Sequence, residues 1–93
     1  MNQQVNDKGI LTVLAKRLVE QRLPRLERLK EQLDRGEVLT DYDLTFMKQV
    51  LEDAQANQAL VDRHPEVQKI VGQIIHLYKE IMDKAFENEN TKN

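Results

Sequence analysis

Apolar side chains recur at helical spacing along most of the chain. In the N-terminal third, apolar residues form a stripe in which most neighbours are three or four residues apart. The members of this stripe are Leu11, Leu14, Leu18, Leu26, Leu29 and Leu33. Arg22 stands at the one position where the stripe would need another apolar residue. Such spacing is typical of an amphipathic α-helix that buries one face. The pattern therefore predicts a helix that starts near Asp7, a residue suited to capping its first turn.

Pro24 leaves two interpretations of this helix open. Proline has no backbone N–H and its ring clashes with the preceding turn, so it either bends a continuous helix or stands in the first turn of a second one. The stripe keeps its phase across Pro24, which favours one long kinked helix over a break near Arg22. Gly36 is expected to end the helix in both cases, because glycine readily adopts the left-handed conformation that follows a helix.

The segment after Gly36 carries the clearest start signal in the chain. Thr40 and Asp43 have the spacing of a capping box, in which each side chain accepts a hydrogen bond from the other residue's backbone N–H. Leu39 and Leu44 flank them as a hydrophobic staple. These four residues predict a second helix that begins at Thr40.

Pro65 separates this second helix from a third. The second helix is expected to end by about Arg63, because the residue before a proline avoids the helical conformation. Pro65 itself suits the first position of a helix. The third helix carries two neighbouring apolar rows, the first made of Val67, Ile70, Ile74, Leu77 and Ile81 and the second of Val71, Ile75, Tyr78, Met82 and Ala85.

Long helices joined by short links predict the fold class. Links of a few residues force neighbouring helices to run antiparallel. We therefore expect an all-α, antiparallel up-down bundle of three long helices, the first kinked or broken at Pro24, so that four helices are the alternative. Residues 1–93 form one domain, and the polar segments 1–6 and 88–93 are expected to be disordered tails.

The last helix has more apolar surface than a three-helix bundle of 93 residues readily covers. A fourth helix, formed by a break at Pro24, would cover the second row within one chain. Otherwise the second row faces another protein or a second copy of this chain. The residues expected to contact that partner are Phe46, Val71, Ile75, Met82 and Phe86. We therefore expect a small protein–protein interaction module that forms a homodimer.

Charge is distributed unevenly and suggests an alternative partner. Residues 1–35 carry eight Lys and Arg against five Asp and Glu, and residues 36–93 carry six against eleven. In a continuous helix, Arg17, Arg25 and Arg28 lie on one ridge that could contact phosphates. The alternative function is thus a nucleic-acid-associated regulatory protein. Neighbouring Glu residues, a net charge of −2 and the lack of Phe and Tyr in the first 41 residues weigh against it.

The chain offers little for catalysis. It has no Cys and no Ser, which excludes disulfides and the commonest nucleophiles, and it has no Gly-rich phosphate loop. The segment from Asp62 to Glu66 gathers two carboxylates and the imidazole of His64 at a helix start, a pattern that helix capping also explains. We expect no enzyme activity, no catalytic residue, no cofactor and no metal site. Whether the segment does more than cap a helix stays open.

The longest apolar run is three residues, far below a membrane span. We therefore expect no membrane contact. The absence of Cys fits a cytoplasmic location, which is the expected one.

Overall fold

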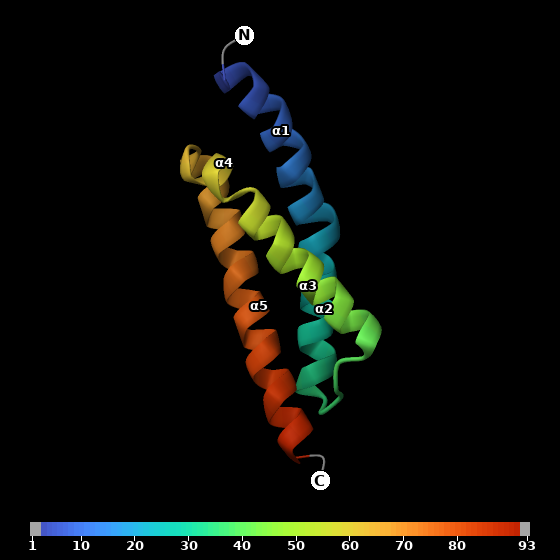
Figure 1. Cartoon of the computed structure of the whole chain (residues 1–93). Coiled ribbons are helices and arrows are strands. Elements are labelled where there is room, and N and C mark those ends of the chain that lie inside the picture. Colours follow the sequence, from blue (N-terminus) through green and yellow to red (C-terminus); the bar gives the residue numbers. More distant parts are fainter. Residues whose placement is uncertain (1–2, 92–93) are drawn as a thin grey trace.

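The structure, a computed structural model, describes residues 3–91, and almost all of them are helical (Figure 1). In chain order the elements are α1 (Gln3–Arg17), the π-helical turn η1 (Leu18–Arg22), α2 (Leu23–Asp34), α3 (Asp41–Ala56), α4 (Gln58–Asp62) and α5 (Pro65–Thr91). Residues 3–91 contain no strand. The predicted all-α helical bundle is confirmed.

The bundle is a rod made of three arms. The first arm is α1, η1 and α2, the second is α3 with α4, and the third is α5, which packs mainly against α2 (Figure 1). The rod measures 58 × 21 × 20 Å, with the start of α1 at one end and the end of α5 at the other. None of the helices within residues 3–91 combines the length and apolarity that a membrane span requires.

Pro24 does not break the first arm. The backbone N–H of Leu23 donates to the carbonyl of Leu18, which closes a π turn just before the proline, and Arg22 and Leu23 keep helical dihedral angles. A π turn holds one residue more than an α turn and widens the helix locally. After Leu18 the next apolar residue packed on the core is therefore Leu23, five positions on, and Arg22 does not need to be apolar. The continuous helix is the correct interpretation, and the break near Arg22 is wrong.

The turn between α2 and α3 forms as its residues predict. Gly36 has a φ of 90°, and its N–H donates to the carbonyl of Leu33. At the start of α3, the N–H of Asp43 donates to Thr40 Oγ1 at 3.1 Å, and the N–H of Thr40 donates to Asp43 Oδ2 at 3.1 Å. The capping box is confirmed on both sides. The predicted cap at Asp7 is wrong, because α1 begins at Gln3 and places Asp7 inside the helix.

The second arm is interrupted where we expected one unbroken helix. Asn57 has φ and ψ of −105° and 10°, and it separates α3 from the short α4. Its side-chain Nδ2 donates to the carbonyl of Asp53 at 2.7 Å, so a local side-chain bond replaces regular helix geometry. The end of this arm at Asp62, two residues before His64, agrees with the effect expected of Pro65.

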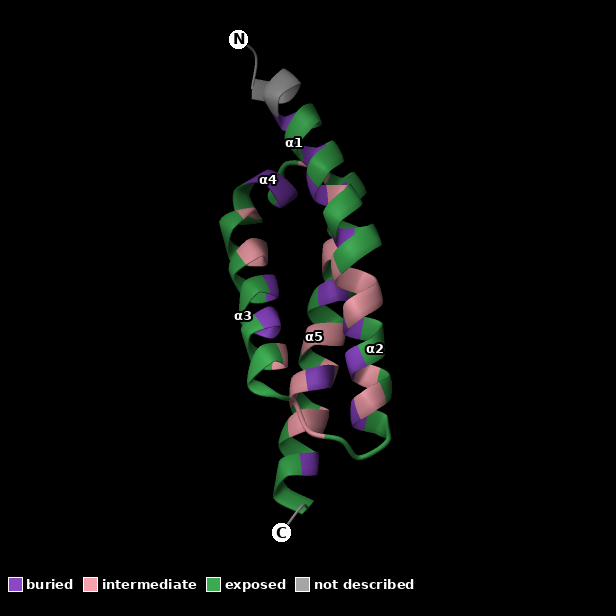
Figure 2. Ribbon diagram, turned by 90° about the vertical axis from the view of Figure 1, so that its right-hand side faces the viewer, coloured by how far each residue is buried: buried purple, intermediate pink, exposed green. Residues whose placement is uncertain are grey.

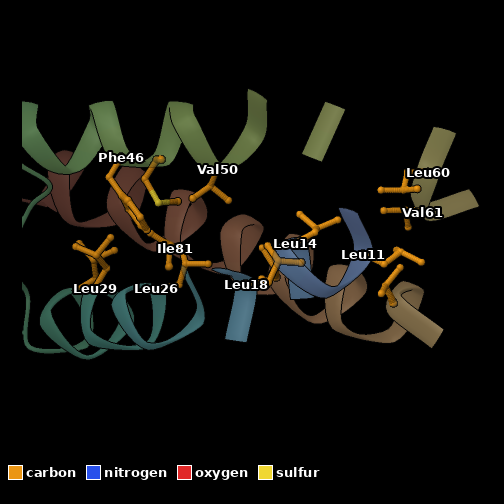
Figure 3. Packing of buried hydrophobic residues seen from close by; sticks show 14 residues of the cluster. Leu11, Leu14, Leu18, Leu26, Leu29, Phe46, Val50, Leu60, Val61 and Ile81 are labelled. Carbon is orange, nitrogen blue, oxygen red and sulfur yellow. The ribbon is translucent and has the colours of Figure 1, made fainter. Parts of the chain in front are cut away.

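The core runs along the whole rod, on the inward faces of the three arms (Figure 2). Figure 3 shows Phe46 and Val50 of α3 facing Ile81, Leu26 and Leu29, while Leu11 and Leu14 lie nearer the α4 residues Leu60 and Val61. The most deeply buried large side chains are Leu26, Leu33, Met47 and Ile81. Every arm therefore contributes to a single core.

The last turn of α5 is held in place by one amide side chain. Asn88 is buried, and its Nδ2 donates to the carbonyls of Leu33 at 2.7 Å and Glu37 at 2.8 Å. These two bonds tie α5 to the last turn of α2 and to the link between α2 and α3. Of the segments expected to be tails, residues 88–91 are helical and belong to α5, and residues 3–6 belong to α1. Residues 1–2 and 92–93 lie outside the described residues.

Candidate protein-binding surface

An apolar groove lies between the start of α3 and the end of α5, toward the C-terminal end of the rod (Figure 1). Leu44 and Phe86 keep 44% and 71% of their surface exposed, while Met82 is half-buried beside them. We name it the α3–α5 groove and define it by the residues that line it, Leu39, Asp41, Leu44, Met82, Ala85, Phe86 and Glu89.

Local sequence places these side chains. Leu39 precedes the Thr40 cap and packs against the core, and the staple spacing sets Leu44 above it on the first turns of α3. On α5, Met82 and Phe86 are four residues apart and so lie on one face of the helix. Met82 reaches the core and Phe86 extends beyond it, which leaves an apolar surface that no element within residues 3–91 covers.

Carboxylates border the groove. Asp41 lies in the first turn of α3, where a negative charge is favourable near the helix N-terminus, and Glu89 lies near the end of α5. Both are exposed, and the described residues that line the groove include no Lys or Arg. The groove thus combines apolar walls with a negative rim, which favours a partner surface that is apolar and basic.

The structure places the five predicted partner residues differently from one another. Phe46 is only 4% exposed and packs in the core, so the expectation that it faces a partner is wrong. Val71 is half-buried against the core, beside a small apolar pocket of about 20 Å³, and lies outside the groove. Met82 and Phe86 line the groove, and Ile75 is exposed but lies outside it.

Phe46 points inward because α3 packs this face against the basic side of α2. The Arg25 guanidinium lies 4.1 Å from the centre of the Phe46 ring, and that of Arg22 lies 5.7 Å from it. Such contacts between a cation and an aromatic ring are favourable and cover the ring. Sequence reasoning in turn missed the role of Leu39 and Leu44 in the groove, although the staple pattern had already placed them together.

The predicted arginine ridge is not a single free surface. Arg25 also lies 4.0 Å from Asp43 Oδ1, so α3 covers the middle member of the ridge. Arg17 and Arg28 are exposed. The π turn between Arg17 and Arg25 adds a residue, so the regular helical spacing that would align them does not hold. The observations therefore give no specific support to phosphate binding by these three residues.

The segment from Asp62 to Glu66 meets α1 through a charged cluster. Arg63 donates twice to Asp7, from Nε to Oδ2 at 3.0 Å and from Nη2 to Oδ1 at 3.1 Å. His64 Nε2 lies 2.9 Å from Asp7 Oδ2, and its Nδ1 lies 3.2 Å from Glu66 Oε1. We name Asp7, Arg63, His64 and Glu66 the Asp7 cluster. Asp7 is buried, and the cluster joins α1 to the link between α4 and α5.

The electrostatics of this cluster are those of a structural bridge. Hydrogen bonds from Arg63 and then His64 hold the pKa of Asp7 below its usual value, and Asp7 raises the pKa of Arg63. Both ring nitrogens of His64 face carboxylate oxygens, and only the protonated imidazolium donates at both. The segment therefore does more than cap α5, because it also fixes the position of α1.

His76 illustrates a simpler role. Its Nε2 lies 2.9 Å from Glu80 Oε1, four residues on, and the His76 side chain is exposed. This is an ordinary surface pair on one helix. Within the part of the chain that the structure describes, no group of three or more His, Asp or Glu side chains could hold a metal ion.

No protein-family model matches this chain, and neither a curated protein nor a solved structure shows significant similarity to it.

Proposed function

We propose that this chain is a small non-catalytic helical module that binds protein and associates with itself through the α3–α5 groove. The observation that carries the proposal is the exposure of Phe86, 71%, beside the exposed Leu44 and the half-buried Met82. Fully burying one large apolar side chain stabilises a complex by roughly 1.5–3 kcal/mol. Covering these residues with a partner therefore contributes favourably to association.

The shape of the rod supports association. Its radius of gyration is 15.2 Å, whereas a compact chain of this length would have about 12 Å. A rod about 20 Å thick has a high ratio of surface to volume and a narrow core. Pairing of two small helical chains is a common way to enlarge such a core.

The oligomeric state tests the proposal directly. We expect light scattering to show the wild-type chain as a dimer between about 1 and 100 μM. Phe86→Ser and Leu44→Ser should each raise the dissociation constant about tenfold or more, because each removes an apolar contact worth over ~1.4 kcal/mol.

Leu51→Ser is the matched control. Leu51 is on the same helix as Leu44, seven residues on, and it is 41% exposed, close to the 44% of Leu44, yet it does not line the groove. We expect this variant to dimerise like the wild type. A wild-type chain that stays monomeric over that range, or equal weakening by Leu51→Ser and Leu44→Ser, would contradict the proposal.

A further inference from the structure

The outer face of α1 combines apolar side chains with the basic side chains that the groove lacks. Ile10 and Val13 are 51% and 59% exposed, and Lys16 and Arg17 are exposed beside them. Each of the other three residues lies three or four positions from Val13, so all four share one face of the helix. We name these four residues the α1 strip. It is a short apolar surface with two cations next to it.

The α1 strip and the α3–α5 groove are complementary in kind. The groove has Leu44, Met82 and Phe86 within a rim that carries Asp41 and Glu89. The strip has apolar residues next to Lys16 and Arg17. The same opposition holds for the whole chain, since residues 1–35 have an excess of basic side chains and residues 36–93 an excess of acidic ones. Complementary charge around an apolar contact sets register and selects the partner.

The two surfaces do not meet within one molecule. The strip lies on α1 toward one end of the 58 Å rod, and the groove lies toward the other end (Figure 1). In a dimer of two antiparallel rods, the strip of each copy would lie at the same end as the groove of the other copy. This arrangement makes the same contact twice, as a two-fold symmetric dimer requires.

We infer that the occupant of the α3–α5 groove is the α1 strip of a second, antiparallel copy of this chain. Ile10 and Val13 contact Leu44, Met82 and Phe86, while Lys16 and Arg17 face Asp41 and Glu89. The inference rests on the proposed self-association and adds to it the identity of both contacting surfaces. It therefore makes a prediction about charge that self-association alone does not make.

A charge-reversal experiment tests this pairing. One variant carries Lys16→Glu with Arg17→Glu, and the other carries Asp41→Lys with Glu89→Lys. Alone, each places like charges at both contacts, so its dissociation constant should rise about tenfold or more, measured by light scattering at low salt. Mixed in equal amounts, the two variants place opposite charges at both contacts. The mixture should then dimerise with a dissociation constant within about threefold of the wild-type value.

Two controls keep the outcome interpretable. Asp41→Lys places a cation near the start of α3, so circular dichroism checks that each variant folds. A second pair of variants, one carrying only Arg17→Glu and the other only Glu89→Lys, tests the same pairing and leaves that helix start intact. Arg28→Glu is the control for charge reversal elsewhere on the same arm, where Arg28 is exposed. We expect Arg28→Glu to dimerise as the wild type does and not to rescue the variant with a basic groove.

The result separates this inference from the proposed function. If the wild-type chain is a dimer that Phe86→Ser weakens, but the mixed variants of both pairs stay monomeric, another surface fills the groove and the inference is overturned. A monomeric wild-type chain overturns both. The pairing is also contradicted if Arg28→Glu, mixed with the variant that carries Asp41→Lys and Glu89→Lys, restores the dimer.

Discussion

The two ends of the rod are held by different kinds of contact. At the end where α4 meets α5, a buried carboxylate accepts hydrogen bonds from Arg63 and faces His64, so the charged groups of the Asp7 cluster find partners within the chain. At the other end, Asn88 ties the last turn of α5 to α2, and next to it Phe86 and Leu44 remain exposed. A contact completed within the chain indicates a structural role. The apolar surface that the described residues leave open is the basis of the proposed association.

The stability of the monomer and the proposed binding depend on different ends of the rod. Substitutions in the Asp7 cluster should change the free energy of unfolding and leave the proposed dimer contact largely intact. Substitutions of the exposed groove residues Leu44 and Phe86 should do the reverse, because exposed side chains contribute little to the stability of the monomer. Asn88 differs from both groups, because its side chain stabilises the fold and it is next to the groove residue Glu89 in the sequence.

Asn88→Ala should produce the largest loss of monomer stability among the variants compared here. It removes the two hydrogen bonds that the amide donates to the carbonyls of Leu33 and Glu37, and each such bond contributes about 0.5–1.5 kcal/mol. Urea denaturation should show this loss in the free energy of unfolding. Asn90→Ala, an exposed position two residues on, is the control and should stay within about 0.5 kcal/mol of the wild type. Equal stability of the two variants would show that Asn88 does not anchor α5.

Asp7→Asn should weaken the other end by a smaller amount. Its partner Arg63 keeps 42% of its side chain exposed, so water can replace part of the lost interaction. The pKa of Asp7 is held below its usual value by Arg63 and His64, so the ionised carboxylate stabilises the fold at neutral pH. This contribution is fully present above the ordinary carboxyl pKa of 3.8, and it is lost as the pH falls through the lowered pKa of Asp7 in the folded chain.

The pH dependence gives the sharper measurement of this end. Between pH 5 and pH 2 the melting temperature of the wild-type chain should fall more than that of Asp7→Asn, because the variant has no carboxyl group to protonate at this position. Asp83→Asn, at an exposed position on α5, is the control and should follow the wild type. Parallel acid profiles for wild type and Asp7→Asn would mean that the cluster contributes no stability through its charge.

The sequence allowed prediction of the helices because capping and periodicity are local. Thr40, Asp43 and Gly36 act through bonds to backbone a few residues away, so their positions alone define a start and an end. The π turn before Pro24 was not predicted, because the stripe keeps its helical phase from Leu18 to Leu26 and only Arg22 interrupts it. Asp7 was assigned to a cap because its partners Arg63 and His64 lie more than 50 residues away.

The candidate surface was predicted in part for a related reason. Apolar periodicity shows which residues share a helix face, but it does not show which faces a neighbouring helix covers. Phe46 and Phe86 are both aromatic residues on amphipathic helices. The guanidinium of Arg25 covers the first of them, and the second lies on the last turns of α5, where it stays 71% exposed among the residues that the structure describes. Only the packing of the arms distinguishes the two.

The smallest expected effect comes from the exposed pair of His76 and Glu80, which resembles part of the Asp7 cluster in chemistry but not in burial. Their 2.9 Å contact lies on the surface of α5, where solvent screens it. Glu80→Gln should therefore change the free energy of unfolding by no more than about 0.5 kcal/mol in urea denaturation. It should also leave the acid profile set by Asp7 unchanged. A destabilisation of Glu80→Gln as large as that of Asp7→Asn would show that burial does not distinguish the two pairs, and the structural role of the Asp7 cluster would lose its physical basis.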